Sequence, residues 1–426
     1  MTKAHGDRTS NIVQLQVSGR VAGVDEALSI YINQLIYGLK HQGEDILTLS
    51  LGEAFFDLPL FDFNKLDKDK GFHYSHSRGI PELRDKIAKY YNDHYGATVN
   101  PEASVLVTAG SKMAIFMALQ AILDPGDDVL IPEPAWLSYQ EHARLLDCRP
   151  VFLPYDCAIA DFARHITPRA RVLVMNNPNN PSGRLYTRDE LCEIYRTCRA
   201  RGIYVLVDEA YSDFVVEGGF HSMAHVVPDL DGVIVINSLS KNMGMSGWRI
   251  GYVLARPEFI ALVLKLNQHL ITCAPSILMY YVATHFDDII RITLPQVRAV
   301  TEKRNRIAGY MDQIGLSYLP GSSTFYFFVS IGSSPNSGFD LALQMLLRDH
   351  IGVVPGAAYG ESTSHFLRIS VGAESEQRIA LALQRVAEVL QEPKFDPQAL
   401  GAALKAKGLP AFQRRAKLQR LEEWSA

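Results

Sequence analysis

Short apolar, β-branched runs alternate with helical segments between about residues 82 and 290, and this alternation constrains the fold more than any other feature of the chain. The helical patterns include ELRDKIAKYYNDHYG and SKMAIFMALQAIL. The strand-like runs are VLVTAG, DDVLIP, PVFLPY, ARVLVMNN, IYVLVDEAY, GVIVINS and IGYVLA. Strands joined through helices run parallel and are buried on both faces, so the sequence predicts an α/β fold with a mainly parallel sheet covered by helices. IGYVLA follows GVIVINS so closely that we expect it to run antiparallel to its neighbour.

The pattern changes beyond about residue 290, where helices expected at 294–315, 339–351 and 374–391 alternate with TFYFFVSIG, GVVPG and HFLRISVG. This order predicts a smaller α+β domain, to which a helix-patterned stretch at 24–43 can return. We therefore divide the chain into four parts. They are a flexible arm (1–23), a small α+β domain (24–60 plus 290–392), a large α/β domain (61–289) and a C-terminal extension (393–426), which is expected to be helical and carries the basic run AFQRRAKLQRLEEW.

Charge and cysteine usage exclude several classes of partner. The 42 Lys and Arg residues nearly balance 46 Asp and Glu residues, for a net charge of −4, which gives no electrostatic case for nucleic acid or an anionic membrane. The five cysteines are scattered and form no CxxC pair, so neither a disulfide framework nor a metal site is expected. We find no secretory signal and no apolar run of membrane-spanning length, and we expect a cytoplasmic protein.

Polar side chains follow five of the predicted strands, at the carboxyl ends where ligands bind in open α/β sheets. Taken singly, each has an ordinary structural explanation as a helix cap, a turn, a core aromatic or a solvated lysine. Taken together they form a complementary set. The set comprises Gly110, Ser111 and Lys112; Trp136; Asn180 within NNPNNPSG; Asp208 and Tyr211; and Ser238, Ser240, Lys241 and Arg249.

One ligand accounts for this set, namely pyridoxal 5′-phosphate (PLP). Its phosphate suits a helix N-terminus with small residues, together with a bidentate arginine such as Arg249. Its ring can stack on Trp136, and its ring nitrogen requires a carboxylate such as Asp208. Its aldehyde forms a Schiff base with a lysine, for which Lys241 is the candidate.

The stretch SLSKNMGMSGWRIG, 238–251, resembles the PLP-lysine signature of the class I/II aminotransferases. NPSG at 180–183 and DEAY at 208–211 are similar to two further landmarks of that family, in the same order, and the resemblance covers about residues 25 to 390. It implies a fold-type-I PLP enzyme, in which a large domain with a mainly parallel seven-stranded sheet is joined to a smaller α+β domain. It also implies a homodimer with the active site at the interface.

The resemblance assigns a role to each matching residue. Lys241, Asp208 and Tyr211 are the implied catalytic residues, with Lys241 forming the Schiff base and moving the substrate proton. Asn180 and Tyr211 bind the oxygen on the ring, while Gly110, Ser111, Ser238, Ser240 and Arg249 hold the phosphate. Gly52 and Arg368, with Asn180, bind the substrate carboxylate, and Tyr74 reaches the phosphate bound by the partner subunit.

The reaction implied is transfer of an amino group between an L-amino acid and a 2-oxo acid. A lyase, oxidase or cyclase of specialised amino-acid metabolism on the same scaffold is the alternative, because fold does not fix reaction. A PLP-binding regulator is disfavoured by the acidic charge and by the short stretch before the first helix. Lys112 either supports the phosphate region or meets a distal substrate carboxylate. Phe55, Phe56 and the HSR run at 76–78 depart from the family pattern and leave the substrate open.

Overall fold

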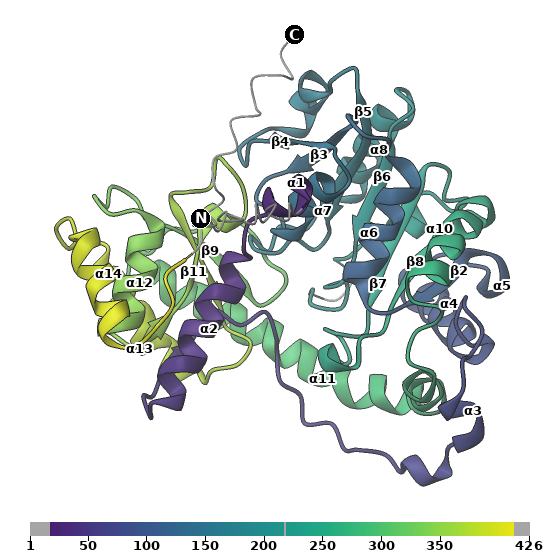
Figure 1. Cartoon of the computed structure of the whole chain (residues 1–426), viewed down its shortest axis with the longest axis horizontal. Helices are drawn as coiled ribbons and strands as arrows, with labels where there is room; N and C mark the ends of the chain where they lie inside the picture. Colours follow the sequence, from purple (N-terminus) through teal and green to yellow (C-terminus); the bar gives the residue numbers. More distant parts are fainter. Residues whose placement is uncertain (1–17, 217–218, 413–426) are drawn as a thin grey trace, which may run out of the picture.

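The computed structural model describes residues 18–216 and 219–412, and its centre is a seven-stranded sheet (Figure 1). The strand order is β2-β8-β7-β6-β5-β3-β4, and β8 runs antiparallel to both of its neighbours while the other pairs are parallel. The predicted α/β class, the mainly parallel sheet and the reversed IGYVLA strand are therefore confirmed. The strands are β2 (Val105–Thr108), β3 (Asp128–Pro132), β4 (Arg149–Leu153), β5 (Ala170–Asn176), β6 (Tyr204–Asp208), β7 (Val233–Ser238) and β8 (Gly251–Leu254).

Alternate side chains of this sheet enter two separate apolar cores. In β5, for example, Leu173 and Met175 belong to one core and Val172 and Val174 to the other. Both faces are buried, which is why the strands read as continuous apolar runs. The first core is covered by α4 (Pro81–Tyr95), α8 (Arg188–Arg199), α9 (Met223–Val226) and the first part of α11 (Ser276–Gln313). The second core is covered by α6 (Ser111–Ile122), α7 (Ser138–Leu145) and α10 (Pro257–Leu270).

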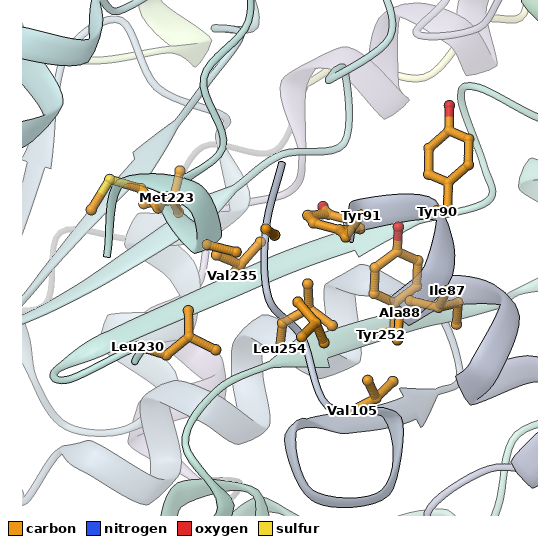
Figure 2. Packing of buried hydrophobic residues seen from close by; sticks show 14 of the residues in the cluster. Ile87, Ala88, Tyr90, Tyr91, Val105, Met223, Leu230, Val235, Tyr252 and Leu254 are labelled. Carbon is orange, nitrogen blue, oxygen red and sulfur yellow. The ribbon is translucent and has the colours of Figure 1, made fainter. Parts of the chain in front are cut away.

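Figure 2 shows how α4 packs on the first core. Ile87, Ala88 and Tyr91 project from one side of the helix toward Tyr252 and Leu254 on β8.

The helix α4 begins with a proline at its first position and ends at Gly96, whose φ of 66° satisfies the left-handed cap. Similarly, the predicted capping box at Thr187 and Glu190 is present and begins α8. Local sequence signals thus set these helix ends.

The smaller sheets lie to the left in Figure 1. β12 pairs with both β11 and β9 in antiparallel fashion, and β1 pairs with β10 in parallel. A separate apolar core fills the space between these strands, α12, α13 and the second part of α11. The elements are β1 (Leu47–Thr48), β9 (Tyr326–Ser330), β10 (Ile351–Gly352), β11 (Val354–Pro355), β12 (Phe366–Ser370), α12 (Gly338–Arg348) and α13 (Glu376–Val389).

The prediction of a helix at 294–315 is wrong about where the helix begins. The helix α11 runs from Ser276 to Gln313 and contains Pro295 in its interior. A proline normally marks a helix start, since it lacks an N–H and its ring crowds the preceding turn. Here packing on both sides overrides that preference: Met279 and Phe286 enter the core of the large sheet, whereas Val297 and Ile307 enter the small core. One helix therefore crosses the expected domain boundary at 290, and the division into domains stays a prediction.

Both terminal regions of the described chain pack on the small sheets. Helix α2 (Leu28–His41) lies beside α12 and α14 (Pro397–Ala406), and residues 393–412 form what we call the C-terminal strap. The short helix α1 (Gly19–Ala22) lies within the expected arm. The rest of that arm and most of the basic run near the C-terminus, at 1–17 and 413–426, lie outside the described residues. The remaining short helices are α3 (Lys68–Phe72) and α5 (Pro101–Ser104).

Candidate active site

A cavity of about 400 Å³ opens between the carboxyl edge of the large sheet and the small sheets. Ligand pockets of this size are typical of small-molecule sites. Twelve residues predicted from the sequence line it: Gly52, Ser111, Lys112, Trp136, Asn180, Asp208, Tyr211, Ser238, Ser240, Lys241, Arg249 and Arg368. Sheet topology explains the convergence of ten of them, because they lie at the carboxyl edge where the parallel strands of the large sheet end. Gly52, after β1, and Arg368, in β12, come from the side of the small sheets instead.

Lys241 follows β7 and reaches into the cavity, where its Nζ donates a hydrogen bond to the backbone oxygen of Gly52 at 2.6 Å. Burial lowers the pKa of its ammonium to about 8, against an opposing attraction from Glu53. A fraction of the side chain is therefore a neutral amine near neutral pH. A neutral amine is the form that can act as a nucleophile or accept a proton.

Asp208 ends β6, one strand away from Lys241 in the sheet order. It is buried, and its Oδ2 accepts a hydrogen bond from the hydroxyl of Tyr139 at 2.8 Å while Oδ1 accepts from the amide of Ala210 at 3.1 Å. Burial raises the carboxyl pKa to about 6, and these hydrogen bonds oppose the rise. The group is therefore mostly ionised at pH 7 and provides a fixed negative charge beside the cavity.

A helix N-terminus and an arginine, two groups that attract anions, lie together in the cavity lining. Helix α6 begins there at Ser111, and the first-turn amides of a helix lack intrahelical acceptors. Arg249 lies alongside with a φ of 55°, and a Cβ on Gly110 would lie 2.6 Å from its Nη2. Gly110 does not line the cavity, but its missing side chain leaves the space that the guanidinium occupies. Ser238 and Ser240 also line the cavity.

A hydrogen-bonded group of aromatic and amide side chains lies at the centre of the cavity. The hydroxyls of Tyr211 and Tyr326 are 2.9 Å apart, and Nδ2 of Asn180 donates to the Tyr211 hydroxyl at 3.4 Å. Asn176 fixes this arrangement, because its Oδ1 accepts from the amide of Asn180 at 2.7 Å and its Nδ2 donates to the backbone oxygen of Asp208 at 2.6 Å. Burial raises the pKa of Tyr211 well above its usual value, so its hydroxyl remains a neutral donor.

Arg368 of β12 enters from the opposite wall and is buried. Its Nη2 donates to the backbone oxygen of Ser50 at 2.5 Å and its Nη1 to Oδ1 of Asn180 at 3.4 Å. The guanidinium lies over the rings of Tyr326 and Tyr359, at 4.7 and 5.3 Å from their centroids. No hydrogen-bond partner for its Nε exists among the described residues. A buried cation held in place in this way can bind a carboxylate in two-point fashion.

Lys112 and Trp136, which both line the cavity, contact each other. The Lys112 Nζ lies 5.1 Å from the centroid of the Trp136 ring, within range of a cation–π interaction. Burial lowers the pKa of Lys112, and Arg249 lowers it further. Neighbouring His142 has its pKa lowered to about 4 by burial and is therefore neutral at pH 7. The geometry is compatible with both roles considered for Lys112.

Tyr74 lies apart from the cavity, with 85% of its side chain exposed. Its expected role depends on a second subunit and stays a prediction. Phe55 is exposed, and Phe56 packs against Phe214 with ring centroids 6.4 Å apart. Arg78 points to backbone oxygens near β2 and donates to that of Val105 at 3.2 Å. None of these departures from the family pattern is a cavity-lining residue.

Sequence reasoning missed eight lining residues: Ser29, Asn33, Ser50, Glu53, Asn176, Ala210, Ser246 and Tyr326. Asn176 is part of the NNPNNPSG run, and Glu53 follows Gly52, so their positions carried a signal. Ser29 and Asn33 are polar residues four apart in α2, which places them on one face of the helix. Tyr326 lies in a run of aromatic residues in which nothing in the sequence distinguishes it.

Across 18–216 and 219–412, no group of three or more His, Cys, Asp or Glu residues is arranged to hold a metal ion. In the same ranges, no helix combines the length and apolar character that crossing a membrane requires.

Comparison with known proteins gives a consistent assignment. The profile of the family "Aminotransferase class I and II" matches residues 48–386. The chain is 32% identical to a (5-formylfuran-3-yl)methyl phosphate transaminase of Methanocaldococcus jannaschii, over 83% of this chain and 94% of that protein. It is also 32% identical to an aspartate/prephenate aminotransferase of Thermus thermophilus, over 88% of this chain and 98% of that one.

A solved structure of aspartate aminotransferase from Thermus thermophilus with maleate superposes with a TM-score of 0.80 at 28% identity, covering 88% of this chain and all of that one. The family match spans most of the chain, and it includes every cavity-lining residue except Ser29 and Asn33 of α2. Members of this family use PLP. The chain therefore belongs to the class I and II aminotransferases and is an aminotransferase, an enzyme that transfers nitrogenous groups.

Proposed function

We propose that this chain is a PLP-dependent aminotransferase that attaches its cofactor at Lys241 and transfers the amino group of an L-amino acid to a 2-oxo acid. The observation that carries the proposal is the position of Lys241 and Asp208 at neighbouring strand ends. They share one cavity with an anion-binding end and a buried arginine. This set of groups matches the three chemical parts of PLP and the carboxylate of its substrate.

The residues present fit the cofactor. Its phosphate would be held by the first turn of α6, by Ser238 and Ser240, and by Arg249. Gly110 supports this placement because any side chain there would displace the guanidinium. Trp136 would cover one face of the ring, and Asn180 and Tyr211 would donate hydrogen bonds to the oxygen on the ring. When bound, PLP supplies an aldehyde that reacts with amines and a ring that accepts an electron pair.

The chain's own groups then bind and move protons. Asp208, ionised at pH 7, holds a proton on a basic nitrogen placed against it, which favours a positive charge there. Lys241 Nζ, with its pKa lowered to about 8, accepts the α-proton of the substrate and returns it at a second position. Arg368 orients the substrate by its carboxylate, and orientation determines which bond to the α-carbon is broken.

A homodimer accompanies this proposal. The chain between β1 and α4 carries large apolar or aromatic side chains that are mostly exposed, at Phe55, Leu60, Phe72 and Tyr74. Exposed clusters of this kind mark interaction surfaces. If Tyr74 reaches the partner's phosphate, Tyr74→Phe should weaken cofactor binding without changing the dimer. Light scattering combined with cofactor titration measures both quantities.

Lys241 provides the direct test of the proposal. Borohydride reduction should fix the cofactor to the wild-type chain, and peptide mass spectrometry should locate it at Lys241. In Lys241→Ala, no cofactor should be fixed and turnover should be lost. A cofactor fixed at any other lysine would refute the assignment.

The reaction itself is tested by two half-reactions. An amino acid should convert the visible absorption of the bound cofactor to the near-ultraviolet absorption of its amine form, and a 2-oxo acid should restore it. Release of ammonia, carbon dioxide or peroxide without that reversal would indicate the lyase or oxidase chemistry instead. A panel of amino acids in the first half-reaction would identify the donor.

A further inference from the structure

Helix α2 presents two different faces. Ser29 and Asn33, four residues apart, line the active-site cavity. Tyr31, Leu35 and Leu39 are buried on the other side. A helix of 14 residues is marginal in water by itself, so the packing of this buried face fixes where Ser29 and Asn33 lie.

The buried face of α2 is covered by two elements. From α12, Leu343 and Leu346 contribute to the shared apolar cluster, and from the C-terminal strap Leu400 and Leu404 do so. Figure 1 shows α2, α12 and α14 in the left-hand part of the molecule, with α14 at its outer edge. Among the described residues, the buried side chains of α2 all belong to this one cluster. The strap therefore supplies part of the packing that holds α2 in place.

Specific contacts fix the strap to α2 along the length of the helix. The Tyr31 hydroxyl donates to the backbone oxygen of Pro410 at 3.0 Å, and its ring centroid lies 5.0 Å from that of Phe412. A Cβ on Gly38 would lie 2.8 Å from Cδ2 of Leu409, so the glycine allows the strap to approach the helix closely. Just beyond the helix, Lys407 Nζ lies 2.6 Å from Oε1 of Glu44.

The cavity face of α2 is connected to Arg368 through a single residue. Oδ1 of Asn33 accepts a hydrogen bond from the hydroxyl of Ser50 at 2.7 Å. The backbone oxygen of the same Ser50 accepts from Nη2 of Arg368 at 2.5 Å. A displacement of α2 would therefore change the position of an acceptor that fixes the guanidinium.

We propose that the C-terminal strap is a positioning element for the substrate carboxylate site. It fixes α2 from outside, and α2 fixes Arg368 through Asn33 and Ser50. Both α2 and the strap lie outside residues 48–386, the range matched by the family profile. The inference rests on the proposed role of Arg368 as the carboxylate-binding residue.

The strap is tested with Leu404→Ala in the full-length enzyme, and Leu383→Ala is the matched control. Both remove a buried leucine from the region around the small sheets, but Leu383 of α13 belongs to a core that contains no buried residue of α2. At comparable loss of melting temperature, Leu404→Ala should raise KM for the amino acid about fivefold and change kcat less than twofold, which is the pattern expected for weakened substrate binding. Equal KM values in the two variants would overturn the proposal.

A milder variant covers the case in which Leu404→Ala does not fold. Tyr31→Phe removes only the hydroxyl that binds Pro410 and keeps the ring against Phe412. It should raise KM in the same direction by a smaller factor. An unchanged KM in Tyr31→Phe, combined with a folded protein, would count against the strap.

The route through Asn33 is tested by a double-mutant cycle. Asn33→Ala alone should raise KM, and adding Leu404→Ala to it should raise KM by less than the product of the two separate factors, because both changes act through one contact. A full product would show that the strap does not act through Asn33, which would overturn the proposed route.

Hydrogen–deuterium exchange separates this proposal from the role of Arg368. Residues 28–41 should exchange faster in Leu404→Ala than in Leu383→Ala, with cofactor present and without it. Unchanged exchange in α2 would overturn the strap itself. If exchange rises while Arg368→Lys leaves KM unchanged, the carboxylate assignment has failed, and the inference that rests on it fails with it.

Discussion

The two walls of the active-site cavity are built in different ways. The wall formed by the large sheet takes its groups from the ends of neighbouring strands: Asp208 is the last residue of β6, and Lys241 lies three residues beyond the end of β7. The opposite wall combines α2, the loop after β1, Tyr326 of β9 and Arg368 of β12, which are brought together only by tertiary packing. The first wall is therefore a consequence of sheet topology, whereas the second depends on contacts between distant segments.

The largest effect is expected on the sheet wall, from Asp208→Asn. In the proposed site a neutral amide would not hold a proton on the cofactor's ring nitrogen, so kcat should fall about 1000-fold, or about 4 kcal/mol. Tyr139→Phe is the control, because it removes a hydrogen bond to Asp208 but keeps the carboxylate. Single-turnover kinetics with an amino acid measure both variants. Similar losses in the two would show that the charge of Asp208 is not what matters.

On the opposite wall, Arg368→Lys should act on binding rather than on chemistry. The lysine keeps the positive charge but cannot make the two-point contact. KM for the amino acid should therefore rise about 50-fold, or about 2 kcal/mol, with a smaller change in kcat. Arg378→Lys, at a partly exposed arginine paired with Asp45 and Glu374 outside the cavity lining, is the matched control and should stay close to wild type. A fall in kcat with KM unchanged would remove the distinction between the walls.

Lys241→Met tests how much folding free energy the burial of the Lys241 ammonium costs in the protein without cofactor. The folded-state pKa of about 8 lies below the value of 10.5 for a free lysine, so between these pH values the unfolded chain binds more protons and stability rises with pH. Below pH 8 the buried lysine is charged and its burial lowers the unfolding free energy by the full amount. After allowance for water in the cavity, this amount is about 2 kcal/mol. The variant should therefore exceed wild type in unfolding free energy by that amount at pH 7.

The gap between Lys241→Met and wild type should close as pH rises from 8 toward 10.5. Urea unfolding at several pH values measures it. A gap that is independent of pH would mean that the burial of the charge is not its cause.

The smallest effect is expected where the walls are joined. Glu133, at the end of β3, accepts hydrogen bonds from the amides of Glu361 and Ser362 and from the Ser362 hydroxyl. Glu133→Gln keeps the shape and one acceptor oxygen, so it should lower the unfolding free energy by about 1 kcal/mol. Ser362→Ala removes one of the same bonds and should give a smaller loss. No change in either variant would show that the walls are joined by other contacts.

The same contrast explains how much could be predicted from sequence. Each strand of the large sheet and every proposed residue at its carboxyl edge follows from local signals, namely an apolar β-branched run and the polar residues after it. Tyr326 and Asn33 gave no comparable signal. Their place in the cavity depends on how β9 and α2 pack, which a single sequence does not specify. Pro295 misled for the same reason, since packing on both sides of α11 outweighs the local preference of a proline.

Helix α11 also sets a mechanical condition on catalysis. Its 38 residues span about 57 Å. The first part of the helix packs in a core of the large sheet, and the second part packs in the core of the small sheets. Pro295 interrupts the backbone hydrogen bonds between these parts, so bending is easiest there. A bend of about 5° at Pro295 would move the far end of the helix by about 2 Å, given its rise of 1.5 Å per residue. A small bend of α11 at Pro295 can therefore close the cavity around a substrate, and the two cores need not slide past each other.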